Sequence, residues 1–179
     1  MNEDFTFISH VGTAAIGQLD DLAPLYEQVY AESPYESGPI WQIDEFVGRT
    51  QRQATRDGFS LVTVHESNGA LVGFSFGLPF AKGHWWSGST DPVPDDISSS
   101  RKFAIIELVV SKPNRGQGVG RRLLDTLLSD RPEPYATLTA VTNADARSIY
   151  EHWGWRQIGS LVNPLQPELR FDILVHAIS

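Results

Sequence analysis

The sequence contains no cysteine among its 179 residues, which excludes disulfides, thiolate zinc sites and a catalytic cysteine. It also has no stretch approaching the ~18 apolar residues of a membrane-spanning helix. The amino-terminal MNEDFTFISH has neither the basic start nor the long apolar run of a signal peptide. We therefore expect a cytoplasmic protein with no membrane partner.

Positive charge is scarce, with 14 Lys and Arg against 22 Asp and Glu and a net charge of −8. This balance argues against a general affinity for nucleic acid. The charges are unevenly distributed, because residues 1–100 hold 14 acids and 4 bases, whereas residues 101–179 hold 8 acids and 10 bases. The first part suits a cationic partner and the second tolerates an anionic one. A solvated acidic surface is the alternative interpretation.

The length favours one domain, and no internal repeat interrupts the chain. Apolar periodicity and turn residues predict seven strands and four helices in mixed α/β order. The predicted strands span residues 5–11, 59–65, 70–80, 102–111, 135–141, 155–162 and 169–178. The predicted helices span 19 to Pro34, with Asp20 or Asp21 as the cap, then 43–57, 119–129 and 144–153. Ser67-Asn68-Gly69 predicts a hairpin, and 81–101 is a long polar connection of a functional or mobile kind.

Three glycines lie between the apolar strand 102–111 and the helix that follows it, in the stretch RGQGVG at 115–120. Glycine lets the backbone approach a ligand closely, and the free N–H groups at a helix start bind phosphate. The dinucleotide fingerprint does not match, because Arg121 stands in place of its third glycine, and no Walker lysine follows. The turn is a candidate anion cradle; a tight turn without a ligand is the alternative.

Two blocks resemble the GCN5-related N-acetyltransferase (GNAT) superfamily. In the first, Arg115, Gly118 and Gly120 fill the Arg/Gln-x-x-Gly-x-Gly/Ala signature after a strand. In the second, Asn143 is followed by Tyr150 seven residues later and then by Gly-Trp at 154–155. The resemblance is specific over residues 104–156. The first hundred residues match in topology alone and indicate no substrate.

The resemblance implies a mostly antiparallel mixed central sheet flanked by helices, in a single domain over 1–179. Within it, 1–101 would form mainly the acceptor side, 102–156 the acetyl-CoA core, and 157–179 the closing strands. Acetyl-CoA would be the co-substrate, with no metal. The cofactor-binding residues implied are Leu108, Val109, Val110, Arg115, Gly116, Gln117, Gly118, Val119, Gly120, Arg121 and Asn143. Tyr150 would face the thioester sulfur, and an amine would attack the thioester directly.

A lysine-like amine with a pKa of ~10.4 is neutral in only about one part in 2,500 at pH 7, a deficit of ~4.6 kcal/mol. Glu107, a lone carboxylate in an apolar strand, is the candidate base, since burial should raise its pKa. A structural carboxylate paired with an arginine is the alternative. For Tyr150, a hydrogen bond to the departing sulfur is the alternative to full proton donation.

The acceptor is expected to be a cationic amine, because acidic residues are mixed with aromatic residues in the two long connections of the first part. The candidate acceptor-binding residues are Tyr35, Trp41, Trp85 and Trp86, and a core position is the alternative for Trp41. A non-catalytic acyl-CoA-binding or regulatory module is the alternative function. The sequence is compatible with either a monomer or a homodimer.

Two further patterns carry less weight. Residues 73–77, GFSFG, match the G-x-S-x-G nucleophile elbow, but the chain continues as a strand where the elbow needs a helix. The five histidines show no i,i+4 pair, so a metal site is not expected.

Overall fold

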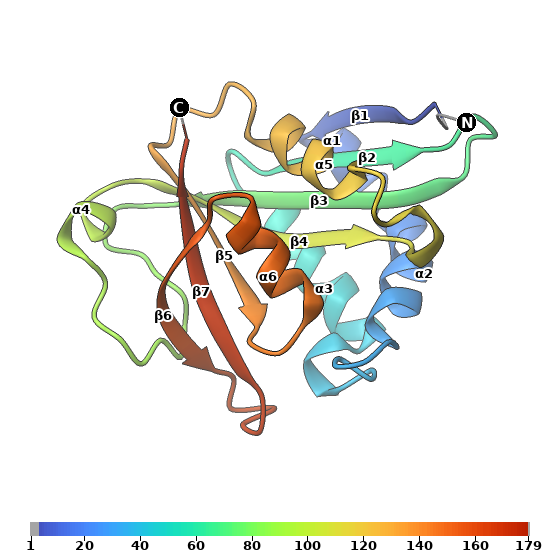
Figure 1. Ribbon diagram of the computed structural model, residues 1–179. Helices are drawn as coiled ribbons and strands as arrows, with labels where there is room; N and C mark the ends of the chain where they lie inside the picture. Colours follow the sequence, from blue (N-terminus) through green and yellow to red (C-terminus); the bar gives the residue numbers. More distant parts are fainter. Residues whose placement is uncertain (1–3, 179) are drawn as a thin grey trace. The chain divides into compact units, whose positions relative to one another are not determined.

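The computed structural model describes residues 4–178, which form seven strands and six α-helices (Figure 1). The strands are β1 (Thr6–Val11), β2 (Ser60–His65), β3 (Leu71–Phe80), β4 (Lys102–Val110), β5 (Tyr135–Val141), β6 (Arg156–Val162) and β7 (Arg170–Ala177). The helices are α1 (Thr13–Ile16), α2 (Leu19–Tyr30), α3 (Ile43–Ala54), α4 (Asp95–Ser98), α5 (Val119–Leu128) and α6 (Asp145–His152), with 3-10 turns at Pro39–Trp41 and Lys112–Asn114. The strands pair in the order β1-β2-β3-β4-β5-β7-β6. The β1–β2, β2–β3, β5–β7 and β6–β7 pairs are antiparallel and the β4–β5 pair is parallel, so the mixed, mostly antiparallel sheet is confirmed.

The four longer helices are the predicted ones, and the one-turn helices α1 and α4 were not predicted. The predicted cap of α2 is wrong: Gln18 is the N-cap, and Asp20 and Asp21 lie in the first turn, where their charge suits the helix dipole. The connection 81–101 is also more ordered than expected, since it contains α4 and a bridge from Ser89 to Leu161.

The chain divides into two compact units. The first comprises the described residues up to 37 together with 41–78 and 105–130, and the second comprises 38–40, 79–104 and 131 onwards. Strands β3 and β4 pass from one unit into the other, so each contributes residues to both.

In the first unit, β1, β2 and β3 run side by side (Figure 1), and α5 packs against β1 and β2. A Cβ at Gly73 would lie 2.9 Å from the Val109 carbonyl oxygen and 3.3 Å from Leu123 of α5, so only glycine fits this close approach. Neighbouring side chains of a strand point to opposite faces. Phe74, next to Gly73, accordingly packs on Phe46 of α3, with ring centroids 6.3 Å apart.

The β2–β3 hairpin forms at the predicted turn. Gly69 takes a positive φ of 85°, and the Asn68 side chain accepts a hydrogen bond from the Ala70 N–H at 2.8 Å. The GFSFG stretch lies inside β3, where Ser75 is buried and its hydroxyl donates to the Glu107 carbonyl oxygen at 2.7 Å. A nucleophile elbow places its serine exposed at a strand-to-helix turn, so the buried Ser75 within β3 is not one, as the sequence predicted.

In the second unit, β5, β7 and β6 form an antiparallel sheet, and the first residues of β4 pair in parallel with β5. This parallel ladder runs from Lys102↔Tyr135 to Ala104↔Thr137, and β4 itself continues to Val110. Helix α6 lies against this sheet (Figure 1). None of the helices within residues 4–178 is long and apolar enough to cross a membrane.

Candidate functional site

Glu107 is a buried carboxylate in the middle of β4, with 6% of its side chain exposed. The Tyr30 hydroxyl of α2 donates to its Oε2 at 2.6 Å, and Nη2 of Arg49 in α3 donates to its Oε1 at 3.1 Å. Burial raises the pKa of the Glu107 carboxyl above its ordinary value, while the Arg49 charge and both hydrogen bonds lower it in part. The pKa of Glu107 is therefore shifted upward, as expected for a base. Glu107 is also paired with an arginine, as expected for a structural carboxylate.

Tyr30 connects Glu107 to two of the predicted acceptor residues. The Tyr30 ring stacks on Trp41 at 5.8 Å between centroids and meets the edge of Tyr35 at 4.8 Å. Burial, followed by the charge of Glu107, raises the pKa of the Tyr30 phenol well above its ordinary value. Tyr30 is consequently a hydrogen-bond donor to the carboxylate at neutral pH, with a partly exposed ring among the aromatic residues of the 31–42 segment.

Tyr30 and Arg49 were missed by sequence reasoning as site residues. Tyr30 is the last residue of α2, and Arg49 is one of several charged residues of α3. Glu107 follows Tyr30 by 77 positions and Arg49 by 58, and no local sequence pattern indicates contacts over such distances.

The glycine turn leads from β4 into α5. Gly116 and Gly118 have φ values of 76° and 79°, and a Cβ at either position would meet no atom within 4 Å. Gly118 is the N-cap of α5, whose first backbone N–H groups have no partner within the helix. The turn thus exposes unpaired N–H groups beside open space, which fits a phosphate group.

The buried residue Asn114, just before the glycine turn, is held by hydrogen bonds. Its side-chain amide donates to Glu66 at 2.7 Å, and Ser111 donates to its oxygen. The Ser111 N–H also donates to the Val72 carbonyl oxygen of β3 at 2.8 Å. These contacts fix the end of β4 to the β2–β3 hairpin and so fix where the glycines begin.

Both arginines assigned to the donor phosphates make ion pairs with carboxylates. Arg115 binds Glu32 at 2.7 Å, and Arg121 lies 3.8 Å from Asp125 one turn later in α5. Gln117 donates to the Pro113 carbonyl oxygen at 3.3 Å, and Val119 is buried. The groups of this turn that are available to a phosphate are therefore backbone N–H groups, because the Arg115, Gln117 and Arg121 side chains already contact other residues.

Tyr150 and Asn143 belong to the second unit. Tyr150 is a buried residue of α6, with its ring edge-on to Trp153 at 5.9 Å and to Trp155 at 6.1 Å. Asn143 precedes α6 and lines an open hollow of about 420 Å³. The other lining residues are Thr142, Ala144, Asp145, Arg147, Ser148, Glu151 and Asp172.

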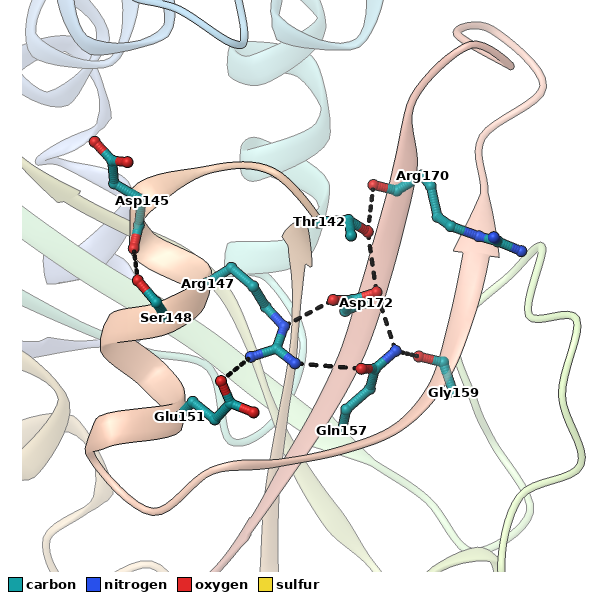
Figure 2. A network of polar contacts seen from close by, with 9 residues as sticks. All are labelled: Thr142, Asp145, Arg147, Ser148, Glu151, Gln157, Gly159, Arg170 and Asp172. Carbon is teal, nitrogen blue, oxygen red and sulfur yellow. Dashed lines mark hydrogen bonds and ion pairs between the residues drawn. The ribbon is translucent and has the colours of Figure 1, made fainter.

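A polar network that includes several of these lining residues holds α6 on the sheet (Figure 2). Arg147 of α6 donates through Nε to Asp172 of β7 at 2.7 Å and through Nη2 to Gln157 of β6 at 3.2 Å. Thr142 and Gln157 donate to the second oxygen of Asp172 at 2.9 and 3.0 Å. Both oxygens of a nearly buried carboxylate are thus satisfied, and α6 is tied to β6 and β7 at one point.

Trp85 and Trp86, the remaining predicted acceptor residues, are half-buried in the second unit. Trp86 donates through its indole to Thr137 of β5 at 3.0 Å and packs edge-on against Phe80. Trp85 lies 5.7 Å from the Lys102 amine, whose pKa is lowered by burial and which donates to the Ile97 carbonyl oxygen. Trp86 is therefore held against the sheet by its indole.

No group of three His, Asp or Glu side chains that could hold a metal ion exists within residues 4–178.

Comparison with known proteins finds a similar family for part of the sequence and similar structures for the fold. The family model of the acetyltransferase (GNAT) domain matches residues 96–163. No curated protein matches the sequence.

Solved structures match the described fold over nearly the whole chain. NAA60 of Arabidopsis thaliana in complex with acetyl-CoA has a TM-score of 0.66 at 13% identity, covering 98% of this chain and 99% of its own. The ribosomal-protein-S18-alanine N-acetyltransferase of Escherichia coli has a TM-score of 0.63 at 17% identity, covering 98% and 95%. A GNAT phosphinothricin acetyltransferase of Sinorhizobium meliloti, in complex with AcCoA, has a TM-score of 0.66 at 14% identity, covering 98% and 89%. Residues 96–163 are therefore similar to the acetyltransferase (GNAT) domain, and the chain has the fold of these solved structures.

Proposed function

We propose that this protein is an acetyl-CoA-dependent N-acetyltransferase that acts on a primary amine. The observation that carries the proposal is that one strand, β4, holds a buried carboxylate at Glu107 and ends in a glycine turn with open space above it. The turn offers backbone N–H groups to phosphate, and the carboxylate offers a base. The family match over 96–163 covers both features.

The donor is assigned to the end of β4 and the turn after it. Backbone groups of Leu108, Val109 and Val110 would pair with the pantetheine arm, and the N–H groups of residues 116–120 would hold the diphosphate. The β4–β5 ladder stops at Ala104, which leaves this later part of β4 outside that ladder. The bound donor supplies an activated thioester. The resemblance adds Asn143 and Tyr150 from the second unit, and these two roles stay predictions.

Glu107 is assigned the role of base. The amine nitrogen forms a bond to the thioester carbonyl carbon, the carbon–sulfur bond breaks, and its electron pair leaves on sulfur. The proton lost by the amine passes through a water molecule to the Glu107 carboxylate. Tyr30 and Arg49 act as positioning residues, because they hold the two carboxylate oxygens in place. Tyr150 would hydrogen-bond the departing sulfur.

The acceptor is proposed to carry positive charge beyond the reacting amine. Glu36, next to Tyr35, and Asp44, three residues after the buried Trp41, are both exposed, which supports a cationic and partly apolar ligand. Glu32, in the same connection, is engaged with Arg115 and contributes less free negative charge.

The test is the release of free CoA from acetyl-CoA in the presence of a panel of amines, with calorimetric binding of CoA measured in parallel. The enzyme should release CoA only when a suitable amine is present, and Glu107→Gln should lower that rate by about 10²–10⁴-fold while still binding CoA. CoA binding without turnover on any amine would favour the non-catalytic module. Absence of CoA binding would contradict the proposal altogether.

A further inference from the structure

All three nitrogens of the Arg115 guanidinium donate to partners from this chain. Its Nε donates to the Val110 carbonyl oxygen at 3.0 Å, and its two terminal nitrogens donate to the two oxygens of Glu32 at 2.7 and 3.1 Å. This is the bidentate geometry in which arginine binds carboxylates and phosphates alike. Arg115 directly precedes Gly116, the first glycine of the turn proposed to hold the donor diphosphate.

Glu32 lies two residues beyond the end of α2, in the connection that carries Tyr35. Its carbonyl oxygen accepts the N–H groups of Tyr35 and Glu36, both at 2.9 Å, so its backbone also closes the turn after α2. The ion pair is accessible, with 41% of the Arg115 and 29% of the Glu32 side chain exposed. Exposed pairs contribute little to folding, so this one can exchange partners without unfolding the chain.

We infer that Glu32 competes with the donor diphosphate for the guanidinium of Arg115 and thereby limits the affinity for acetyl-CoA. This inference rests on the proposed function. Arg115 immediately precedes the N–H groups that would hold the diphosphate. With Nε bonded to Val110, its two terminal nitrogens cannot bind Glu32 and a second anion in bidentate fashion at once. The Glu32 carboxylate must then either yield Arg115 or repel the incoming charge. In both cases a neutral side chain at position 32 favours the donor.

The test is calorimetric titration of CoA at constant ionic strength into the full chain and its variants. Glu32→Gln should tighten the Kd for CoA by about three- to tenfold. Arg115→Ala should change the Kd less than about threefold in the parent chain, where Glu32 already occupies the side chain. In the Glu32→Gln background the same substitution should abolish the gain, so the two substitutions are non-additive.

Glu36→Gln is the matched control. It removes the same charge from the same connection, and Glu36 makes no ion pair among the described residues. Its Kd should stay within about twofold of the parent value, and thermal unfolding should show all variants folded.

An unchanged Kd in Glu32→Gln would overturn the inference, as would equal tightening by Glu36→Gln, which would indicate a general field effect. An equal loss on Arg115→Ala in both backgrounds would also overturn it. In these three cases CoA still binds, and the proposed function stands. A parent chain that does not bind CoA would overturn both.

Discussion

The Tyr30 hydroxyl lies 2.6 Å from the Glu107 carboxylate, and this bond joins the α2 helix to the middle of β4. Arg49 approaches the other oxygen from α3, so two helices fix one buried acid. Burial alone would favour the protonated form, which cannot accept a proton. The two donors stabilise the carboxylate and keep it available as a base while its pKa stays above the ordinary value.

The pH dependence of Glu107 should respond to Arg49. Because Glu107 must be ionised to accept a proton, kcat/KM should fall as the pH drops through its pKa. Arg49 lowers that pKa, so Arg49→Gln should raise it and move the acid limb of the profile to higher pH. The pKa itself can be followed by carbon-13 NMR of the glutamate carboxyls.

Arg52→Gln is the control for this prediction, because Arg52 is an exposed residue of the same helix. It should leave the Glu107 titration unchanged. An Arg49→Gln profile that coincides with the parent profile would show that Arg49 does not set the ionisation of Glu107.

Tyr150→Phe should lower kcat and leave the Kd for acetyl-CoA nearly unchanged. A hydrogen bond to the departing sulfur strengthens only as charge develops, so its loss affects the transition state more than the bound state. Phenylalanine keeps the ring that packs on Trp153 and Trp155. Steady-state kinetics with calorimetry measure both quantities, and equal turnover by the two proteins would make Tyr150 a packing residue.

Asp172→Ala should destabilise the fold by about 3–5 kcal/mol, because it removes the buried carboxylate that pairs with the nearly buried Arg147 at 2.7 Å. Glu151 makes the matched comparison. It pairs with the same arginine at 3.5 Å but is 65% exposed, so Glu151→Ala should cost less than about 0.5 kcal/mol. Urea unfolding of both variants measures the two costs, and similar losses would mean that the network in Figure 2 does not anchor α6.

The acceptor proposal predicts a salt effect. Amines with an additional positive charge should give the highest kcat/KM, and this value should fall as salt rises, because screening at ~0.15 M acts over about 8 Å. A panel of polyamines, aminoglycosides, aromatic amines and amino acids would measure the preference. Best turnover with an anionic amine, or rates indifferent to salt, would contradict the charge argument.

Local patterns predicted the elements that local chemistry determines. The Ser67-Asn68-Gly69 turn required a positive φ at its glycine and has it. The strand–turn–helix unit at the glycine turn followed from an apolar run, three glycines and a leucine stripe, of which Leu123, Leu124 and Leu127 are buried. These features depend on neighbours a few residues apart, so periodicity was enough to find them.

The partners of the site residues depend on tertiary contacts and could not be predicted in this way. The sequence indicated Glu107 because it interrupts an apolar strand, but its donors come from two helices that precede it. Arg115 was assigned to phosphate from the motif, and nothing near it in sequence indicates Glu32, 83 positions away. These residues meet because segments far apart in the sequence pack together in the fold. Hydrophobic periodicity within one helix or strand does not indicate which segments will meet.

The central claim is that the 115–120 turn holds the donor phosphates, and calorimetry of CoA binding to two alanine variants tests it most directly. Gly118 and Gly69 both have a positive φ and open space at the Cβ position, so alanine costs each a similar backbone strain of roughly 1–2 kcal/mol. Only Gly118 lies where phosphate would approach. The account predicts at least a tenfold weaker Kd in Gly118→Ala and an unchanged Kd in Gly69→Ala. Equal affinities in the two folded variants would contradict it.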